Sequence, residues 1–284
     1  MELHHKAERE GKLLTFLRRE LNLSSSLVKR LKWQKAFCVN GAPVHTDHLL
    51  RPGDDICVRL EEALPEFPPQ DGHLDILFED EALLAVDKPP EMLMHPSFYQ
   101  DTGTLANFVA GYYQKTAQPC AVHPVSRLDR DTFGVVLLAK NAHVHGKMMA
   151  LLQSRQVQKT YEALVFGCPA EPEGLWDFPI AKKDGSLLRE VQPGGQQALT
   201  RYRVMEQFGS CSRLELEPVT GRTHQLRVHC AHAGCPILGD PQYGTAETAM
   251  GFSHQQLCAV RLTFPHPLMG KAVTVFSKQK VSFP

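Results

Sequence analysis

A proline-rich segment divides the chain into two unequal parts. Residues 64–72, LPEFPPQDG, contain three prolines and a glycine, a composition that continues neither a helical nor a strand periodicity. The chain has 284 residues, which is more than one ordinary core accommodates. We therefore predict a small domain at residues 1–64, an exposed linker at residues 65–72 and a larger domain at residues 73–284.

The composition and the amino terminus narrow the class of protein. Hydrophobic residues make up 43% and charged residues 22% of the chain, which is typical of a soluble globular protein. The apolar run at residues 135–139 is far shorter than the roughly 18 residues of a membrane helix. The first residues, MELHHKAEREGKLL, lack the apolar block of a secretory signal. We expect a cytoplasmic protein with no membrane partner, whose eight cysteines are free thiols.

The first sixty residues have the pattern of a compact module. Leucines recur at helical spacing from Leu13 to Leu21, and Ser24 is a suitable N-cap for a second helix. The pair Asn40-Gly41 lies between two apolar segments, which is a strong hairpin signal. Alternating apolar residues at 56–60 predict a further strand. The expected order is therefore helix, helix, hairpin and strand.

This module also carries a local excess of positive charge. The net charge of the whole chain is zero, but residues 1–60 hold eleven Lys and Arg against seven Asp and Glu. Within residues 12–35, Glu20 is the only acid among seven basic residues. Two interpretations stay open on composition alone: a solvated helical surface, or a face for a polyanionic partner. Trp33 is assigned to packing between the helices in preference to stacking on a base.

The sequence pattern of the larger part of the chain predicts many strands and few helices. Strand patterns occur in LDILFED, ALLAVDKPP, VVLLAK, TYEALVFG, TRYRVMEQF, CSRLELEPV and AVRLTF. Helical patterns lie near residues 103–114, 141–153 and 223–233. Several of the strand segments alternate between apolar and polar residues. We predict an α+β fold with a mixed, mostly antiparallel central sheet, preceded by the small α/β domain.

The stretch HPVSRLDRDTFGVVLLAKN, residues 123–141, is the strongest candidate for chemistry. Asp129 lies between Arg127 and Arg130, just before the apolar run. Burial disfavours a charged carboxylate unless a cation offsets the cost, and an ionised carboxylate can act as a nucleophile or a base. Taken alone, the stretch would be read as a surface ion pair.

Four segments together resemble the RluA-type pseudouridine synthases. RLDRDTFGVVLLAK resembles the family's active-site motif, usually HRLDxxTSG followed by an apolar strand. Three other segments, one before this motif and two after it, occur in the order that the family has: LLAVDKPPEMLMHPS (83–97), KTYEALVFG (159–167) and PVTGRTHQLRVHCAHAGCPILGDPQYG (218–244). Residues 12–60 resemble the small RNA-binding domain, named after a ribosomal small-subunit protein, that many members carry. The resemblance covers nearly the whole chain.

The resemblance implies the pseudouridine synthase fold and an isomerase that converts uridine to pseudouridine in structured RNA, without a cofactor or metal. Its catalytic residues would be Asp129, Tyr161 and Arg227, with Arg227 keeping Asp129 ionised and Tyr161 lying against the base. Arg127 would hold the RNA open after the target uridine turns outward. Further substrate contacts are expected from Leu226, Arg222 and Lys159. The RNA-binding residues of the small domain would be Lys12, Arg18, Arg19, Arg30 and Lys32.

The sequence departs from the family motif at two positions. Ser126 stands where the family more often has histidine, and Phe133 replaces the serine of TSG. Neither change touches Asp129, although Ser126 cannot supply a charge. The hypothesis is that activity survives with a narrower or altered choice of target.

Several alternatives stay open at this point. Large-subunit ribosomal RNA is the first expected target and transfer RNA the second, and a monomer is the default state. A non-catalytic RNA-binding relative is the nearest alternative. A retaining hydrolase would need a second carboxylate about 5 Å away, for which Asp131 and Asp87 are candidates. A zinc site is disfavoured because the spacing of its possible ligands is poor; they are His224, His229, Cys230, His232 and Cys235.

Overall fold

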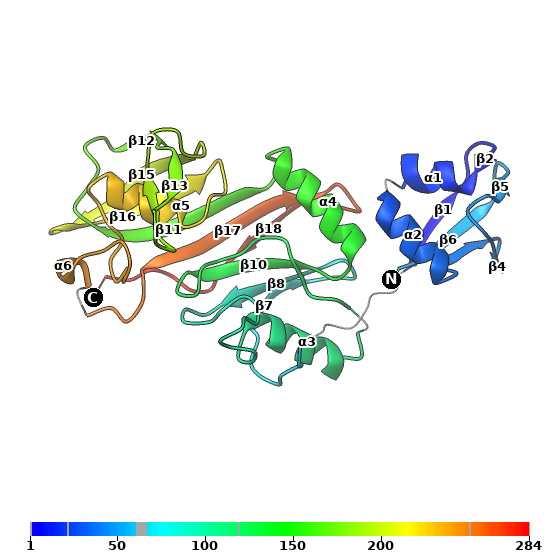
Figure 1. The fold of residues 1–284 in the computed structure, drawn as a ribbon, viewed down its shortest axis with the longest axis horizontal. Helices are drawn as coiled ribbons and strands as arrows, with labels where there is room; N and C mark the ends of the chain where they lie inside the picture. Colours follow the sequence, from blue (N-terminus) through cyan, green and yellow to red (C-terminus); the bar gives the residue numbers. More distant parts are fainter. Residues whose placement is uncertain (1, 22, 61–66, 119, 250, 284) are drawn as a thin grey trace.

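The computed structural model describes residues 2–21, 23–60, 67–118, 120–249 and 251–283 (Figure 1). Its amino-terminal part contains six strands and two helices within these residues. In chain order they are β1 (Glu2–Lys6), β2 (Gly11–Lys12), α1 (Leu13–Arg19), α2 (Ser25–Trp33), β3 (Phe37–Val39), β4 (Ala42–Pro43), β5 (Leu49–Leu50) and β6 (Asp55–Arg59).

The two helices and the strands of this part share one hydrophobic core. The Ser24 hydroxyl accepts a hydrogen bond from the backbone N–H of Leu27 at 3.2 Å, which begins α2. Asn40 and Gly41 both have positive φ, +51° and +79°, and form the tight turn between β3 and β4 that the Asn-Gly pair predicts. Strand β1 pairs with β6 in a sheet of order β1-β6-β3-β4, a pairing that the sequence did not suggest.

The expectation that Trp33 packs between the helices is wrong. Its side chain is 82% exposed. The buried face of α2 is made by Leu27, Val28 and Leu31, and a residue two positions after Leu31 points to the other side of a helix. Trp33 therefore stands on the outer surface of the amino-terminal part.

The rest of the chain forms one large sheet with helices and a small hairpin. Its elements are β7 (Ile76–Glu79), β8 (Leu83–Lys88), α3 (Leu105–Lys115), β9 (His123–Pro124), β10 (Phe133–Ala139), α4 (Ala142–Gln153), β11 (Gln158–Phe166), β12 (Glu173–Asp177), β13 (Ile180–Lys182), β14 (Arg189–Val191), β15 (Leu199–Phe208), β16 (Cys211–Pro218), α5 (Gln225–His232), α6 (Ala246–Ala249), β17 (Leu257–Pro265) and β18 (Ala272–Phe276).

The sheet is mixed and mostly antiparallel, which confirms the predicted fold class. Its strand order is β12-β15-β16-β11-β17-β10-β8-β7, with β18 added beside β17 and β9 beside β10. Among the described strands, the β10–β17 ladder alone is parallel. Figure 1 shows β11, β17, β10 and β8 running side by side through the middle of the domain.

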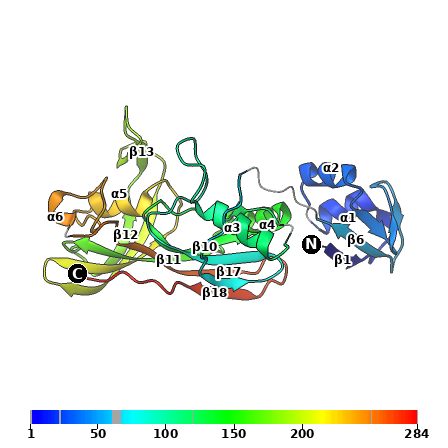
Figure 2. The same ribbon diagram turned by 90° about the horizontal axis from the view of Figure 1, so that it is seen from below.

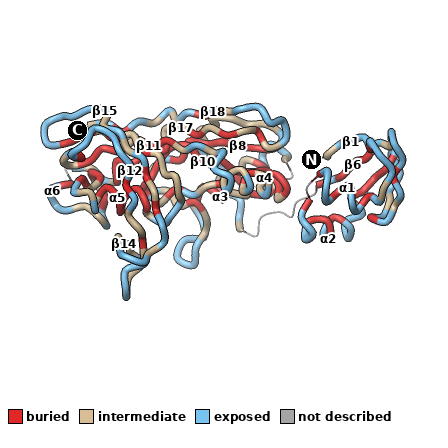
Figure 3. Tube along the Cα trace, turned by 90° about the horizontal axis from the view of Figure 1, so that it is seen from above, coloured by how far each residue is buried: buried red, intermediate tan, exposed pale blue. Residues whose placement is uncertain are grey.

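Both faces of the central strands are covered. Along β10, Val136 and Leu138 belong to the core cluster that includes residues of α3 and α5, whereas Val135 and Leu137 belong to the cluster that includes residues of α4. Successive strand residues point to opposite faces, so β10 is buried on both sides, as the buried central strands of Figure 3 show.

Residues 67–72 contain no helix or strand and are held against α3. The Asn107 side chain donates to the Pro68 carbonyl at 2.8 Å, and the Gln70 N–H donates to the Asn107 carbonyl at 3.0 Å. The first two residues of the predicted linker, 65 and 66, lie outside the described residues. The division into domains therefore stays a prediction. No helix in the described parts of the chain is long and apolar enough to cross a membrane.

Strands β13 and β14 form a hairpin that projects from the domain (Figure 2). Leu187, between the two strands, is 82% exposed. The hairpin lacks a strong apolar alternation, and for that reason its strands were not predicted.

Gly134 allows the close contact between β10 and β17, and we predict that Gly134→Ala destabilises the protein. Gly134 has a φ of +105°, and an added Cβ would lie 2.4 Å from the Ala259 carbonyl oxygen. Backbone strain of this kind costs about 1–3 kcal/mol, before any displacement of β17. The measurement is urea unfolding. The control is Gly146→Ala, in helix α4 where the new methyl group meets open space; equal midpoints for the two variants would contradict the prediction.

Candidate active site

The loop between β9 and β10 presents Asp129 at the edge of the central sheet. Leu128 is buried in the core, while the Asp129 side chain keeps 33% exposure. The Thr132 N–H donates to the Asp129 carbonyl at 3.2 Å, which closes the turn before β10. The Gln255 side-chain amide donates to the Thr132 hydroxyl. Two independent contacts thus hold the short segment from Asp129 to Thr132.

Lys88 supports the same loop from β8. Its side chain is fully buried, and its ammonium group donates to the carbonyl oxygens of Pro89, Met92 and Arg130 at 2.8–2.9 Å. Burial lowers the pKa of Lys88 to about 7, against the opposing effect of the Asp131 carboxylate. The lysine at the end of β8 therefore fixes the backbone immediately after Asp129.

Arg227 reaches Asp129 from helix α5. Its Nη1 donates to Asp129 Oδ2 at 3.1 Å, and its side chain is only 5% exposed. Its Nε and Nη2 donate to the two carboxylate oxygens of Asp240 at 2.7 and 2.8 Å. Burial acts to lower the pKa of Arg227, but the hydrogen bonds and charge of Asp240 outweigh it, and the pKa is raised. The sequence-predicted pair of Asp129 and Arg227 is brought together.

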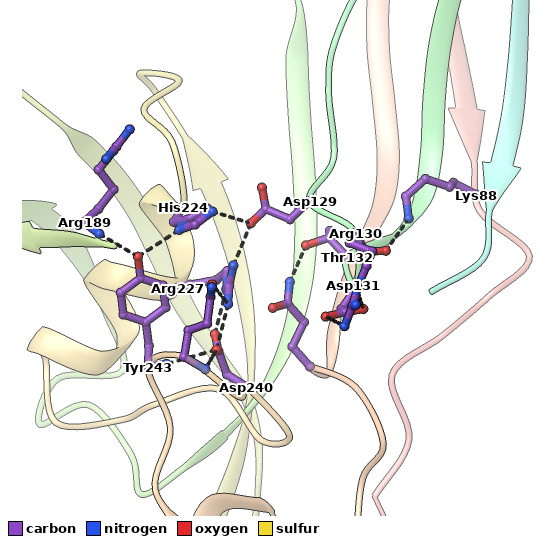
Figure 4. Close-up of polar contacts among 12 residues, drawn as sticks. Lys88, Asp129, Arg130, Asp131, Thr132, Arg189, His224, Arg227, Asp240 and Tyr243 are labelled. Atoms are coloured by element: carbon purple, nitrogen blue, oxygen red, sulfur yellow. Dashed lines mark hydrogen bonds and ion pairs between the residues drawn. The ribbon is translucent and has the colours of Figure 1, made fainter. Parts of the chain in front are cut away.

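Two further side chains complete the network around Asp129 (Figure 4). His224 Nε2 lies 3.9 Å from Asp129 Oδ2, and His224 Nδ1 lies 2.8 Å from the Tyr243 hydroxyl. The Tyr243 ring also lies 5.0 Å from the Arg227 guanidinium. Both contacts that the described residues make with the Asp129 carboxylate are to Oδ2, so Oδ1 is available to a bound molecule.

Tyr161 lies in the apolar core next to the loop of Asp129. It is 9% exposed on β11 and shares a core cluster with Leu226 and Leu128. Burial raises the pKa of Tyr161, and the charge of Asp129 acts in the same direction. An apolar cluster with one aromatic ring therefore adjoins the polar network.

The remaining predicted substrate residues surround this centre less closely. Arg127 is exposed, and Lys159 is half-buried on β11, two residues before Tyr161 and on the same strand face. Burial lowers the pKa of Lys159. Arg222 donates from Nε to the Gln197 carbonyl at 3.0 Å and stays exposed. None of these three makes a described contact with Asp129.

Sequence reasoning missed the roles of Lys88, His224, Asp240 and Tyr243. A signal existed for three of them: Lys88 precedes two prolines in one motif, and Asp240 and Tyr243 are two of the three polar positions of GDPQYG. His224 was weighed as a metal ligand, with RNA contact or packing preferred. These residues act through hydrogen bonds to other side chains or, for Lys88, to backbone carbonyl oxygens, and a linear pattern does not show such pairings.

The candidates for a zinc site on α5 have other partners. His229 Nε2 lies 3.0 Å from the Phe178 carbonyl, and Cys230 and Cys235 are buried in the hydrophobic core. In the described parts of the chain, the one group of donor atoms close enough to share a metal ion is Glu2, His4 and Cys57, in the amino-terminal sheet. The Glu2 carboxylate already forms an ion pair with Arg59, whose Nε lies 3.0 Å from Glu2 Oε1.

The two carboxylates considered for a hydrolase are engaged elsewhere. Asp87 is 5% exposed and accepts hydrogen bonds from the Ser277 hydroxyl and the Lys278 N–H at 2.7 Å. Asp131 forms a two-bond ion pair with Arg130 at 2.9 and 3.1 Å. Neither makes a described contact with Asp129, and this arrangement gives no support to a two-carboxylate hydrolysis.

Comparison with known proteins agrees with this geometry. Residues 82–232 match the family described as RNA pseudouridylate synthase. The chain is 34% identical over 269 residues to the RNA pseudouridine synthase YhcT of Bacillus subtilis, covering 92% of this chain and 87% of that protein. It is 35% identical to ribosomal large subunit pseudouridine synthase D of Escherichia coli K12, covering 77% of this chain and 71% of that one. The solved structure of human RNA pseudouridylate synthase domain containing 4 has a TM-score of 0.59 at 27% identity, covering 73% of this chain and 88% of that one.

We predict that Lys88→Met destabilises the protein by about 3 kcal/mol, because it removes the donor of three hydrogen bonds to backbone carbonyl oxygens, each worth about 1 kcal/mol. Chemical unfolding measures the change. The control is Lys115→Met, which removes an exposed ammonium paired with Asp71 at 3.4 Å and should leave the midpoint unchanged. A Lys88→Met protein as stable as this control would show that the loop does not depend on the lysine.

Proposed function

The chain belongs to the family of RNA pseudouridylate synthases, which isomerise uridine in RNA, and on this premise we propose that it modifies a specific uridine of large-subunit ribosomal RNA, with Asp129 as the reacting group. The observation that carries the proposal is the ion pair of Asp129 with the buried Arg227. Both residues lie within the range that matches the family. One carboxylate oxygen is held by the protein, and the other faces outward.

The chemistry of the reaction fits a single ionised carboxylate. The bond between C1′ of the ribose and N1 of uracil breaks, a bond from C1′ to C5 forms, C5 loses a proton and N1 gains one. No oxidation, reduction or net hydrolysis occurs, so we propose that the reaction uses no cofactor. Asp129 serves as a nucleophile toward the nucleoside or as a base that removes a proton from it. Both routes require the ionised carboxylate that Arg227 stabilises.

The residues around Asp129 suit a uridine that has turned out of the RNA. Turning the base outward costs a few kcal/mol, and stacking of a base on an aromatic ring contributes about 1–3 kcal/mol. Tyr161 and Leu226, which share a core cluster with Leu128 just before Asp129, are proposed to contact the flipped base. Arg127, exposed beside the catalytic loop, is proposed to fill the space that the base leaves.

Lys159 and Arg222 are proposed to bind the RNA backbone near the pocket. Lys159 lies on the Tyr161 face of β11 and is half-buried, and the described residues give its ammonium group no hydrogen-bond or ion-pair partner. Arg222 lies exposed just before α5. A phosphate group would supply the negative charge that each of them can bind.

The amino-terminal part is proposed to bind RNA through its basic surface. Its five proposed contact residues are all exposed; they are Lys12, Arg18, Arg19, Arg30 and Lys32. Helices α1 and α2 each end in two of them. The exposed Trp33 stands beside Lys32, and we now assign it a stacking contact with an RNA base.

The choice of large-subunit ribosomal RNA follows from the named activity of the Escherichia coli relative, and transfer RNA is the second candidate. A cytoplasmic, monomeric protein remains the working proposal. Phe133 is proposed to affect target choice through packing. It is 4% exposed in a cluster with Leu164 and Cys258, and its ring lies edge-on to His254 with the ring centroids 5.5 Å apart.

Asp129→Asn is expected to abolish the reaction. The measurement is chemical mapping of pseudouridine on cellular RNA that lacks this enzyme's own modification, incubated with purified protein in the presence of chelator. The parent protein should create a new site, and its position identifies the RNA, including transfer RNA. The matched control is Asp71→Asn, at the surface, which should act as the parent does. RNA binding without a new site would favour the non-catalytic alternative, and release of free uracil would favour a hydrolase.

Neutralising the amino-terminal basic residues should weaken RNA binding and flatten its salt dependence. Each lost phosphate contact lowers the slope of log K against log salt by about 0.7–0.9. The variant replaces Lys12, Arg18, Arg19, Arg30 and Lys32 by Gln, and its affinity for the mapped RNA is measured from low to moderate salt. The control replaces Lys182, Lys183, Lys271, Lys278 and Lys280, five lysines outside the amino-terminal part. A slope that stays at the parent value would remove that part from the binding surface.

A further inference from the structure

Two residues of the Asp129 network have no part in the proposed function so far. The Tyr243 hydroxyl accepts a hydrogen bond from the Arg189 backbone N–H at 2.9 Å and lies 2.8 Å from His224 Nδ1. His224 in turn faces Asp129, and Figure 4 shows the four groups in sequence. Tyr243 belongs to the segment GDPQYG, whose other polar residues, Asp240 and Gln242, both accept hydrogen bonds from Arg227.

The hydrogen bonds of Tyr243 are compatible with the His224 tautomer that suits Asp129. Because the Tyr243 hydroxyl accepts from the Arg189 N–H, its own proton can point at His224 Nδ1. In that arrangement Nδ1 is the acceptor, and the ring proton of the neutral imidazole lies on Nε2, the nitrogen that faces Asp129. The nearby carboxylate favours this tautomer, because an N–H group attracts it whereas a bare nitrogen lone pair repels it.

The charges around His224 favour its neutral form on balance. Burial is the largest effect and lowers the pKa of His224. The carboxylates of Asp129 and Asp240 act to raise it, whereas the guanidinium groups of Arg227 and Arg189 act to lower it. Burial and the two arginines outweigh the two carboxylates, and the pKa of His224 is lowered.

The backbone and the ring packing hold this arrangement in place. His224 has a φ of +56° at the start of α5, a left-handed conformation that is uncommon for a residue other than glycine and persists where the surroundings enforce it. Tyr243 packs its ring against the Arg227 guanidinium, 5.0 Å away. One tyrosine thus contacts both groups that meet Asp129 Oδ2.

We propose that Tyr243 and His224 are positioning residues for Asp129: Tyr243 sets the tautomer and rotation of His224, whose Nε2–H joins Arg227 in holding Oδ2 so that Oδ1 faces the uridine. This inference rests on the proposed function. The distance of 3.9 Å from Nε2 to Oδ2 exceeds a direct hydrogen bond. It shortens when bound RNA excludes water, as catalytic hydrogen bonds often tighten only in the complex.

The first test compares single-turnover rates of pseudouridine formation on the mapped RNA. Tyr243→Phe removes only the hydroxyl, and the rate constant should fall about ten- to one-hundredfold, the range for a misplaced catalytic group, while the affinity for RNA stays unchanged. The matched control is Tyr112→Phe, which also removes a hydrogen-bonded hydroxyl, here 2.6 Å from Glu79, and should keep the parent rate.

The second test separates the two nitrogens of His224. In His224→Gln the side-chain amide can place an N–H donor where Nε2 lies in the histidine. In His224→Asn the shorter side chain places its amide only where Nδ1 lies. Asn adopts the left-handed conformation more readily than Gln, so a purely structural role for His224 predicts the better result for Asn. Our inference predicts the opposite order, with His224→Gln retaining at least ten times the rate of His224→Asn.

The pH dependence of the rate gives a readout that misfolding does not imitate. Loss of the Tyr243 hydroxyl removes the hydrogen bond that stabilises neutral Nδ1, so in Tyr243→Phe the pKa of His224 rises. The imidazolium then persists to higher pH, and its full positive charge beside Oδ2 makes the ionised Asp129 a weaker nucleophile or base. The acid limb of the pH–rate profile should therefore move to higher pH in Tyr243→Phe, whereas general structural damage lowers the rate equally at every pH.

The possible outcomes distinguish this inference from the function on which it rests. If the parent protein forms no pseudouridine, the proposed function fails and the inference falls with it. If the parent is active and Tyr243→Phe matches it in rate and pH profile, only the inference is overturned. A folded His224→Asn that outperforms His224→Gln overturns it as well.

Discussion

The site depends on one buried guanidinium shared between two carboxylates. Arg227 directs Nε and Nη2 to Asp240, which is fully buried at 0% exposure, and Nη1 to Asp129, which keeps 33% exposure. A buried cation is costly unless it is paired, and Asp240 alone meets that requirement. The second carboxylate leaves one net negative charge in the group. Asp129 is the member of the group that solvent can reach.

The large sheet makes this pairing possible because it joins distant parts of the chain. Asp129 and Arg227 are 98 residues apart in sequence. Strand β10 follows the loop of Asp129 and lies between β8 and β17, so Lys88 supports the loop from one neighbouring strand. Gln255, just before β17, reaches its Thr132 from the other. The loop that carries Asp129 is therefore restrained by the strands on both sides of β10.

The regular parts of this structure were predictable, and the contacts between side chains were mostly not. The strands around Val136 and Ala163 and the three long helices of the larger domain follow from apolar periodicity. The hairpin β13–β14 and the edge strands β1, β12 and β18 have weak patterns, because edge positions bury less apolar surface. Trp33 was misplaced because an aromatic residue beside a helix was assumed to pack inward. Asp129 and Arg227 were identified through resemblance, whereas the pairing of Tyr243 with His224 depends on tertiary geometry.

The hairpin β13–β14 touches the network around Asp129 through a main-chain group. The Arg189 contact to Tyr243 uses the backbone N–H, not the guanidinium. Every residue except proline carries that donor, so the hydrogen bond itself would survive most substitutions at residue 189. The Arg189 guanidinium acts separately, through its charge on His224. The exposed end of the hairpin around Leu187 contributes neither effect, so its sequence can diverge while the Tyr243–His224 pair keeps its support.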